Sequence, residues 1–211
     1  MGYYPIYVDM RRRRCLVIGG GVVAERKVAS LVEAGAAVTV ISPDITEQIA
    51  RWSKSGAIDF LARRYRTGDL AEFELAFVAT DDSKVNAAVY EEGKNRGVWV
   101  NSADDPEHCD FILPSIIRRG NLVVAISTGG ESPALARAVR EELDEYFTAD
   151  YARVVEIASE VRLELRARSL SASADAWNQA LKGNFRCLIR EGRLEEAKKI
   201  LLETLETKLC A

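Results

Sequence analysis

The chain has 211 residues, of which 48% are hydrophobic and 29% are charged, and this composition excludes a disordered protein. The 29 basic and 32 acidic side chains give a net charge of −3, which argues against a general nucleic-acid binder because such proteins need a basic excess. No apolar run reaches the roughly 18 residues of a membrane span, and residues 1–10 do not resemble a signal peptide. We therefore expect a cytoplasmic protein with no nucleic-acid or membrane partner.

The cysteines and the single histidine do not have the spacing of a zinc site. Cys15, Cys109, Cys187 and Cys210 form no C-x-x-C pair, and His108 has no second histidine to accompany it. Structural zinc sites need such ligands in close pairs. We expect four reduced thiols and no metal site.

The first half of the chain alternates short apolar runs with amphipathic segments. Strands are expected at residues 15–18, 38–41, 58–62, 75–79 and 98–100, since each run is short, apolar and closed by a turn-forming residue. Helices are expected from Ala24 to a stop at Gly35, over residues 45–52, and over residues 83–96 before Gly97. This alternation predicts an α/β fold with a Rossmann-type, doubly wound parallel sheet.

The pattern changes after residue 113. Two β-branched runs, 116–117 and 122–126, flank a Gly-Asn turn and predict a hairpin. Ser132 and Pro133 have the residue types of a helix N-cap and first helical position, and the apolar stripe of that helix is expected at Leu135, Val139, Leu143 and Tyr146 or Phe147.

The remainder of the sequence is typical of helices alone. One helix is expected over residues 151–168, followed by a break over 169–173 and by two more helices on either side of Gly192. We divide the chain into a Rossmann domain at 1–113, a small α+β segment (hairpin plus helix) at 114–148, and a helical C-terminal domain at 149–211.

A glycine-rich turn follows the first expected strand. The spacing Gly19-x-Gly21-x-x-Ala24 fits the dinucleotide-binding pattern G-x-G-x-x-G/A. In this pattern the first glycine permits a tight turn, the second lets the backbone approach a pyrophosphate, and the small third residue lets helix and strand pack closely. The motif lies between a strand and a helix, whose N-terminus attracts phosphates. We therefore expect a bound dinucleotide.

The segment after the second strand indicates which dinucleotide binds. Residues 38–50 contain no Lys or Arg that could receive a 2′-phosphate, so we expect NAD rather than NADP. Asp44 comes two residues later than the usual ribose-binding acid, and its role stays open. The expected cofactor-binding residues are Gly19, Gly20, Gly21, Val22, Val23, Ser42, Pro43, Asp44 and Thr80.

Two further loops carry candidate chemistry. Asp104 follows the fifth strand, near the expected nicotinamide, where it could be a general base or only part of an Asx-turn. His108 is expected to be a solvated loop residue, and Cys109 a packing residue. The loop containing Gly129 and Gly130, just before a helix, is either a second anion site or a flexible connection.

Several separate blocks of the sequence resemble the siroheme synthase dehydrogenase family. They are Pro5-Ile6-Tyr7, Gly19 to Lys27, Ala79 to Asp82, Asn101 to Asp104, Phe111 to Ile116, and Ser127 to Pro133. The blocks occur in family order over residues 5–140, and their combination is far more specific than the glycine turn alone.

This resemblance implies precorrin-2 dehydrogenase activity, an NAD-dependent oxidation of precorrin-2 to sirohydrochlorin in siroheme biosynthesis. It implies that Asp104 is the family's essential aspartate and general base, and that Ser127, Thr128, Gly129 and Gly130 contact the polycarboxylate tetrapyrrole substrate. It also implies a homodimer formed through residues 114–148. Because the sequence ends at Ala211, we expect it to lack the methyltransferase domain fused to some members.

Two alternatives remain open at this point. Bifunctional members of the family are also ferrochelatases, and the sequence does not decide whether this chain inserts a metal. A non-catalytic NAD(H)-binding regulatory protein would carry the same glycine turn, but would not need Asp104.

Overall fold

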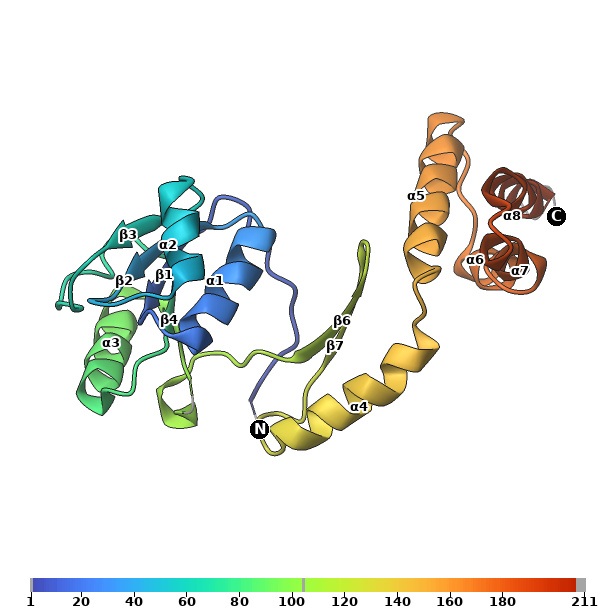
Figure 1. Ribbon diagram of the computed structural model, residues 1–211. Coiled ribbons are helices and arrows are strands. Elements are labelled where there is room, and N and C mark those ends of the chain that lie inside the picture. Colours follow the sequence, from blue (N-terminus) through green and yellow to red (C-terminus); the bar gives the residue numbers. More distant parts are fainter. Residues whose placement is uncertain (1, 104, 208–211) are drawn as a thin grey trace. The chain divides into compact units, whose positions relative to one another are not determined.

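The computed structural model describes residues 2–103 and 105–207, and the chain divides between Leu113 and Pro114 into two compact units (Figure 1). Each unit has a hydrophobic core of its own. None of the helices described has the length and apolar composition needed to cross a membrane.

The first unit contains a parallel sheet. Its described strands are β1 (Arg14–Ile18), β2 (Ala37–Ile41), β3 (Asp59–Leu61), β4 (Leu75–Val78) and β5 (Trp99–Ser102), and they pair in the order β3-β2-β1-β4-β5. The register places Val17 of β1 opposite Val40 of β2 and Phe77 of β4. Continuous apolar runs suit such strands because both faces of a doubly wound sheet are covered. The predicted Rossmann-type architecture is confirmed.

Helices cover both faces of this sheet. α1 (Val22–Glu33) and α2 (Glu47–Lys54) pack on one face, where Val28 and Ile49 join the core formed by β1, β2 and β4 (Figure 1). α3 (Ser83–Arg96) covers the other face through Val89. Gly97 ends α3 in the left-handed conformation, with φ 72°, which a residue without Cβ adopts easily. The helix that the sequence predicts over residues 83–96 is therefore confirmed.

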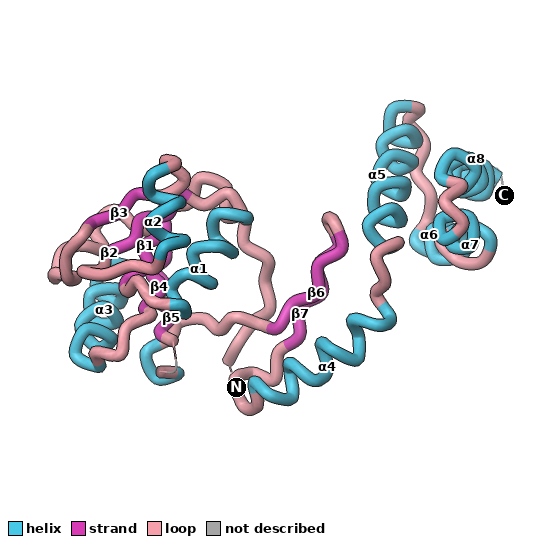
Figure 2. The backbone as a smooth tube through the Cα atoms, in the orientation of Figure 1, coloured by secondary structure: helices cyan, strands magenta, loops and turns pink. Residues whose placement is uncertain are grey.

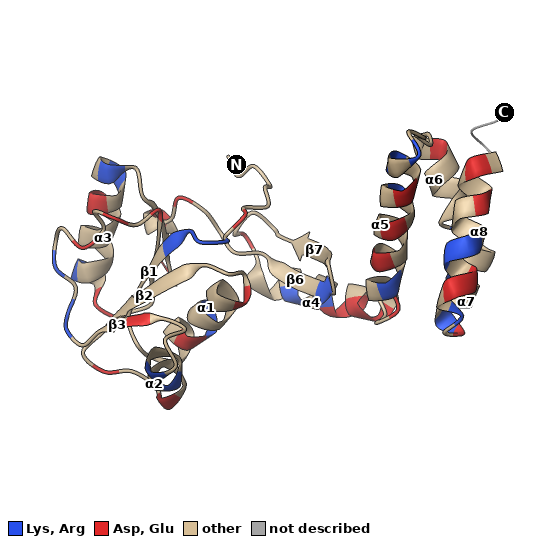
Figure 3. Cartoon of the chain, turned by 90° about the horizontal axis from the view of Figure 1, so that it is seen from above, with Lys and Arg blue, Asp and Glu red and all other residues tan. Residues whose placement is uncertain are grey.

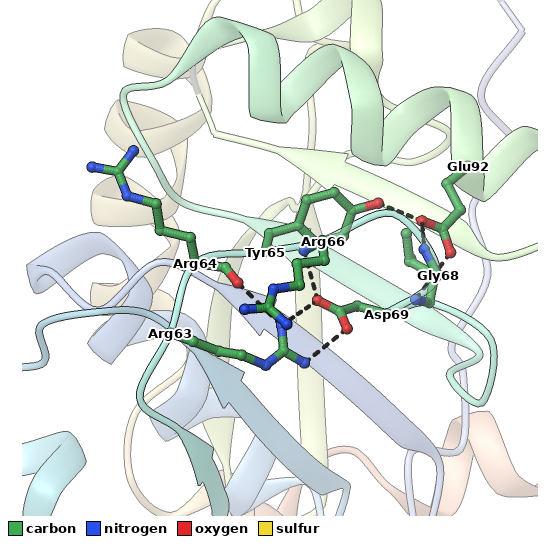
Figure 4. Close-up of polar contacts among 8 residues, drawn as sticks. Arg63, Arg64, Tyr65, Arg66, Gly68, Asp69 and Glu92 are labelled. Carbon is green, nitrogen blue, oxygen red and sulfur yellow. Dashed lines mark hydrogen bonds and ion pairs between the residues drawn. The ribbon is translucent and has the colours of Figure 1, made fainter.

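The connection from β3 to β4 is held by an ion pair (Figure 4). Two guanidinium nitrogens of Arg63 donate to the two carboxylate oxygens of Asp69, at 2.7 and 2.8 Å, and the backbone N–H of Arg66 donates to the same carboxylate at 2.8 Å. The hydrogen bonds from Arg63 lower the pKa of Asp69. Arg63 thus stabilises the conformation of this loop.

A buried carboxylate from α3 holds the same connection from the other side (Figure 4). Glu92 accepts hydrogen bonds from the hydroxyl of Tyr65 at 2.5 Å and from the backbone N–H groups of Gly68 and Leu70 at 2.7 and 3.2 Å. Burial alone would raise the pKa of Glu92, but these bonds and the charge of Arg96 outweigh it, and the pKa falls. The loop is therefore tied to the α3 side of the sheet.

The second unit begins with a hairpin and a helix. β6 (Ser115–Arg119) pairs antiparallel with β7 (Leu122–Ile126) around Gly120 and Asn121, as the sequence predicts. α4 (Pro133–Tyr146) starts at the N-cap Ser132, whose hydroxyl accepts from the N–H of Leu135 at 3.2 Å. Arg119 links the hairpin to the end of α4 by donating to the carbonyl of Phe147 at 2.6 Å and pairing with Asp144 at 2.9 Å.

The predicted apolar stripe of α4 is only partly covered within this chain. Val139 and Leu143 are half-buried, but Leu135 is 54% exposed, and Ile116 on β6 is 45% exposed. Exposed apolar side chains of this size are found on surfaces that pack against another molecule.

The rest of the second unit is helical, and Figure 2 shows it without strands. Its described helices are α5 (Tyr151–Ala167), α6 (Ala174–Ala180), α7 (Asn184–Arg190) and α8 (Leu194–Thr207). The prediction of one helix before Gly192 is wrong, because two short helices, α6 and α7, lie there. The chain turns between them at Gly183, with φ 65° and ψ −130°, a conformation that side-chain-bearing residues avoid.

These helices enclose an apolar core with a charged exterior. Val161 and Leu165 of α5, Phe185 of α7 and Leu201 of α8 are almost fully buried together. On the outside, α5 and α8 carry mixed charges (Figure 3), including the pair between Lys198 and Glu160 at 2.8 Å. Exposed pairs of this kind contribute little stability, so the apolar core dominates.

Candidate active site

The glycine turn between β1 and α1 is packed tightly against its neighbours on two sides. A Cβ on Gly19 would lie 2.1 Å from the carbonyl oxygen of Ala79, and the φ of Gly19 is 117°. A Cβ on Gly20 would lie 2.0 Å from the carbonyl oxygen of Asp44. The tight turn expected at Gly19 is present, and Gly20 is required by a close approach that the motif spacing does not reveal.

Gly21 differs, because a Cβ there would meet no described atom within 4 Å. It is the N-cap of α1, and its carbonyl accepts from the N–H of Glu25 at 2.9 Å. The next residue, Val22, is 67% exposed. The helix therefore presents its first N–H groups and the positive end of its dipole at an open surface. Ala24, the small third residue of the motif, is fully buried against the sheet.

The segment after β2 lies against the same turn. The buried Ser42 donates from Oγ to the carbonyl oxygen of Asp44 at 2.6 Å, and the N–H of Thr46 donates to the carbonyl of Gly20 at 3.0 Å. Pro43 and Asp44 are exposed. The structure thus brings Ser42, Pro43 and Asp44 to the glycine turn, where a ligand on α1 would meet them.

A pocket of about 340 Å³ lies on the other side of the turn, at the carboxyl ends of β4 and β5. Its lining comes from α1, from the start of α3 and from the segments after β4 and β5, and comprises Val23, Ala79, Thr80, Asp81, Ser83, Asn86, Ala103 and Asp105. Thr80 is half-buried, and its Oγ1 accepts from the N–H of Asp82 at 3.3 Å. The predicted cofactor residues Val23 and Thr80 therefore share one pocket.

Hydrogen bonds from α1 and to the following loop hold the end of β5 in place. β5 continues through Asn101 and Ser102, two residues beyond the expected strand. Nζ of Lys27, on α1, donates to Oδ1 of Asn101 at 2.8 Å, and Nδ2 of Asn101 donates to the carbonyl of Phe111 at 2.9 Å. Burial raises the pKa of Cys109, so its thiol stays protonated. This agrees with its expected role as a packing residue.

The prediction that His108 is a solvated loop residue is wrong. Nδ1 of His108 lies 2.7 Å from Oδ2 of Asp105, and its ring packs in a T-shaped arrangement with the ring of Tyr90, with 5.1 Å between centroids. His108 ends a 3-10 turn, η1 (Pro106–His108), which brings it back to a residue that lines the pocket. Asp104 lies outside the described residues, so its expected role stays a prediction.

The expected substrate loop belongs to the second unit. Oγ1 of Thr128 accepts from the N–H of Ser132 at 2.9 Å and donates to its carbonyl at 3.0 Å, and the N–H of Gly129 donates to Oγ of Ser127 at 3.0 Å. Gly129 and Gly130 both have positive φ, 68° and 89°. These residues form the ordered connection from β7 to α4, and their contact with substrate stays a prediction.

The part of the chain covered by the structure contains no group of three or more His, Cys, Asp or Glu side chains that could hold a metal ion. The site residues instead fit a dinucleotide. The open N-terminus of α1 at Gly21 suits a pyrophosphate, and the pocket beyond it has the size of a small-ligand site. This site lies where β1 and β4 adjoin and the strand order reverses, which is where such sheets bind ligands.

The sheet order, glycine turn and switch-point pocket together define a dinucleotide-binding protein of the Rossmann type. The chain belongs to the NAD(P)-binding family, whose pattern its residues 6–115 match. Residues 119–146, which hold most of the hairpin and α4, match the family described as sirohaem biosynthesis protein, central.

Individual relatives extend this similarity over almost the whole chain. A siroheme synthase from Nitrosococcus oceani is 40% identical over 98% of this chain and 44% of its own length. Siroheme synthase 1 from Pectobacterium atrosepticum is 40% identical over 97% of this chain and 43% of its own length. The chain thus spans less than half the length of these curated relatives.

A solved structure is similar from end to end. SirC, a precorrin-2 dehydrogenase, superposes with a TM-score of 0.76 and 26% sequence identity, covering 93% of this chain and 99% of that one. The similarity therefore includes the helical C-terminal region as well as the Rossmann domain.

Proposed function

We propose that this protein oxidises precorrin-2 to sirohydrochlorin with NAD as the hydride acceptor, as a step of siroheme biosynthesis. The observation that carries the proposal is the end-to-end similarity to a precorrin-2 dehydrogenase, combined with a dinucleotide turn that opens onto a pocket. The curated relatives support the same pathway, since they are siroheme synthases.

The cofactor would lie across the glycine turn. The N–H groups of α1 at Gly21, Val22 and Val23 would bind the pyrophosphate, and Gly19 and Gly20 hold the turn close to the sheet. Ser42, Pro43 and Asp44 would face the adenosine ribose, and Thr80 the nicotinamide half. When bound, NAD supplies the acceptor for a hydride from the substrate.

We propose NAD rather than NADP. Residues 38–50 offer no Lys or Arg for a 2′-phosphate. Arg63, which lies just after the neighbouring strand β3, has its guanidinium engaged by Asp69.

Asp104 is proposed as the general base. Oxidation of the substrate removes two hydrogens, one as hydride and one as a proton, and a carboxylate can accept that proton. The two neighbours of Asp104 in sequence, Ala103 and Asp105, both line the pocket that would take the nicotinamide. The proton would thus be taken up at the site of hydride transfer.

The substrate and the oligomeric state complete the proposal. Precorrin-2 carries many carboxylates, and the loop Ser127, Thr128, Gly129 and Gly130 before α4 would bind some of them through backbone N–H groups. A homodimer formed by residues 114–148 would cover the exposed Leu135 and Ile116. The protein would act in the cytoplasm, without a membrane or nucleic-acid partner.

The test uses Asp104→Asn together with the wild-type protein. With precorrin-2 and NAD under anaerobic conditions, the wild type should form NADH and sirohydrochlorin. The variant should lose this oxidation while its affinity for NAD stays within about twofold, because the base does not hold the cofactor. If the variant keeps wild-type turnover, Asp104 is not the base. If the variant loses NAD binding instead, the residue is part of the cofactor site.

A further inference from the structure

Asn86 is the most deeply buried polar residue among those that line the pocket. It lies in the first turn of α3, where its backbone N–H donates to the carbonyl of the N-cap residue Asp82 at 3.0 Å. The residue lines the pocket with Thr80 and Ala103, although it is only 7% exposed. The fold therefore holds an amide at the edge of a cavity and shields it from bulk water.

The side-chain oxygen of Asn86 lacks a hydrogen-bond donor. Across residues 2–103 and 105–207, Oδ1 is one of the few buried polar side-chain atoms with no partner. Buried polar groups are nearly always hydrogen-bonded, because an unpaired one retains the full cost of leaving water. A ligand group with a donor would remove this cost if it entered the pocket and the Asn86 side chain turned to meet it.

The strand order indicates which part of the cofactor reaches Asn86. The pyrophosphate would lie at Gly21, between β1 and β4, and the adenosine half on the β2 side, next to Ser42 and Asp44. The pocket is on the opposite side, at β4 and β5. It would therefore hold the nicotinamide half of the dinucleotide.

The nicotinamide ring carries a primary carboxamide, which offers both a donor N–H and an acceptor oxygen. An asparagine side chain offers the same two groups, so the two amides can exchange a pair of hydrogen bonds. We propose that the side-chain amide of Asn86 binds the nicotinamide carboxamide and so sets the rotation of the ring at the site of hydride transfer. This inference rests on the proposed NAD site and adds a specificity-determining residue to it.

The experiment measures binding alone, by titration calorimetry. The ligands are NAD and 3-acetylpyridine adenine dinucleotide, in which a methyl group replaces the carboxamide nitrogen and its two donor hydrogens. The variants are Asn86→Ala and Asn86→Ser, in which the side chain is too short to make the pair. Asn95→Ala is the matched control, since Asn95 is an exposed asparagine on the same helix.

The wild type and Asn95→Ala should bind NAD about tenfold more tightly than the acetylpyridine analogue, as expected for one lost hydrogen bond that leaves a buried acceptor unpaired. In both Asn86 variants the affinity for NAD should fall about tenfold and the preference over the analogue should disappear. A thermal melt checks folding, and the wild-type preference is measurable even if one variant is unstable.

Two results would overturn the inference. The wild type could bind both ligands equally, or the Asn86 variants could keep the wild-type preference; if they kept it while binding both ligands more weakly, Asn86 would contact another group of the dinucleotide. If the wild type binds NAD but either result is found, only the Asn86 assignment fails. If it does not bind NAD at all, the proposed function fails as well.

Discussion

Substituting Gly20 and Gly21 one at a time tests whether the two glycines have different roles. Gly20→Ala should affect mainly the stability of the turn. The added Cβ would lie 2.0 Å from the carbonyl oxygen of Asp44 and 2.8 Å from both Oγ of Ser42 and Cγ2 of Ile45. A backbone carbonyl held by its own hydrogen bond from Ser42 cannot move aside cheaply. The variant must therefore separate the turn from the segment after β2.

The expected cost follows from the number and kind of these contacts. Overpacking a well-filled site costs about 1–3 kcal/mol, and we expect the upper half of that range because one of the three close contacts is with backbone. For a domain of this size, such a loss lowers the melting temperature by roughly 5–12 °C.

Gly21→Ala is the matched comparison, since its Cβ would meet no described atom within 4 Å. Its φ of −81° suits any residue, so only the weaker N-cap preference of alanine should cost stability, at most about 1 kcal/mol. Its methyl group would instead obstruct the approach of the pyrophosphate, and NAD affinity should fall more than tenfold. Thermal melts and calorimetry measure the two effects. Equal destabilisation by both variants, or unchanged NAD affinity in Gly21→Ala, would refute the division of roles.

Three further predictions concern other parts of the fold. Asp69→Asn should lower the free energy of unfolding by about 1–3 kcal/mol near neutral pH; because the hydrogen bonds from Arg63 depress the pKa of Asp69, the difference from wild type should shrink as the pH falls below about 4 in denaturant titrations. Burial raises the pKa of Cys15 to about 12, so mass spectrometry should find Cys15 unmodified by a thiol reagent under conditions in which the exposed Cys187 reacts. Arg119→Met should speed amide hydrogen exchange across β6 and β7, because it removes the bonds that tie the hairpin to α4; unchanged protection would contradict this link.

The alternating strands and helices of the first unit could be predicted from sequence because each element has its own local signal. Gly97, for example, follows the last turn of α3 and takes the left-handed conformation that a helix stop requires. The break between α6 and α7 was missed, since Gly183 lies in a segment whose composition suits a continuous helix. The chain instead turns at Gly183, whose positive φ ends one helix before the next begins.

The sequence predicts the parts of the site that are formed by residues close together in the chain, such as the glycine motif. The pattern from Gly19 to Ala24 identified the turn, but it could not show that Gly20 meets a carbonyl 24 residues away. Asn86 gave no signal, because one asparagine in a helix is ordinarily a surface residue. The bond between Lys27 and Asn101 spans 74 positions and exists only once α1 packs against the sheet.

An anaerobic reaction of the purified protein with precorrin-2 and NAD tests the proposed oxidation itself. NADH and sirohydrochlorin should appear together and in equal amounts, and neither should form when NAD is omitted. If precorrin-2 remains unchanged while NAD is demonstrably bound, the protein is not a precorrin-2 dehydrogenase, and its NAD site has a non-catalytic role.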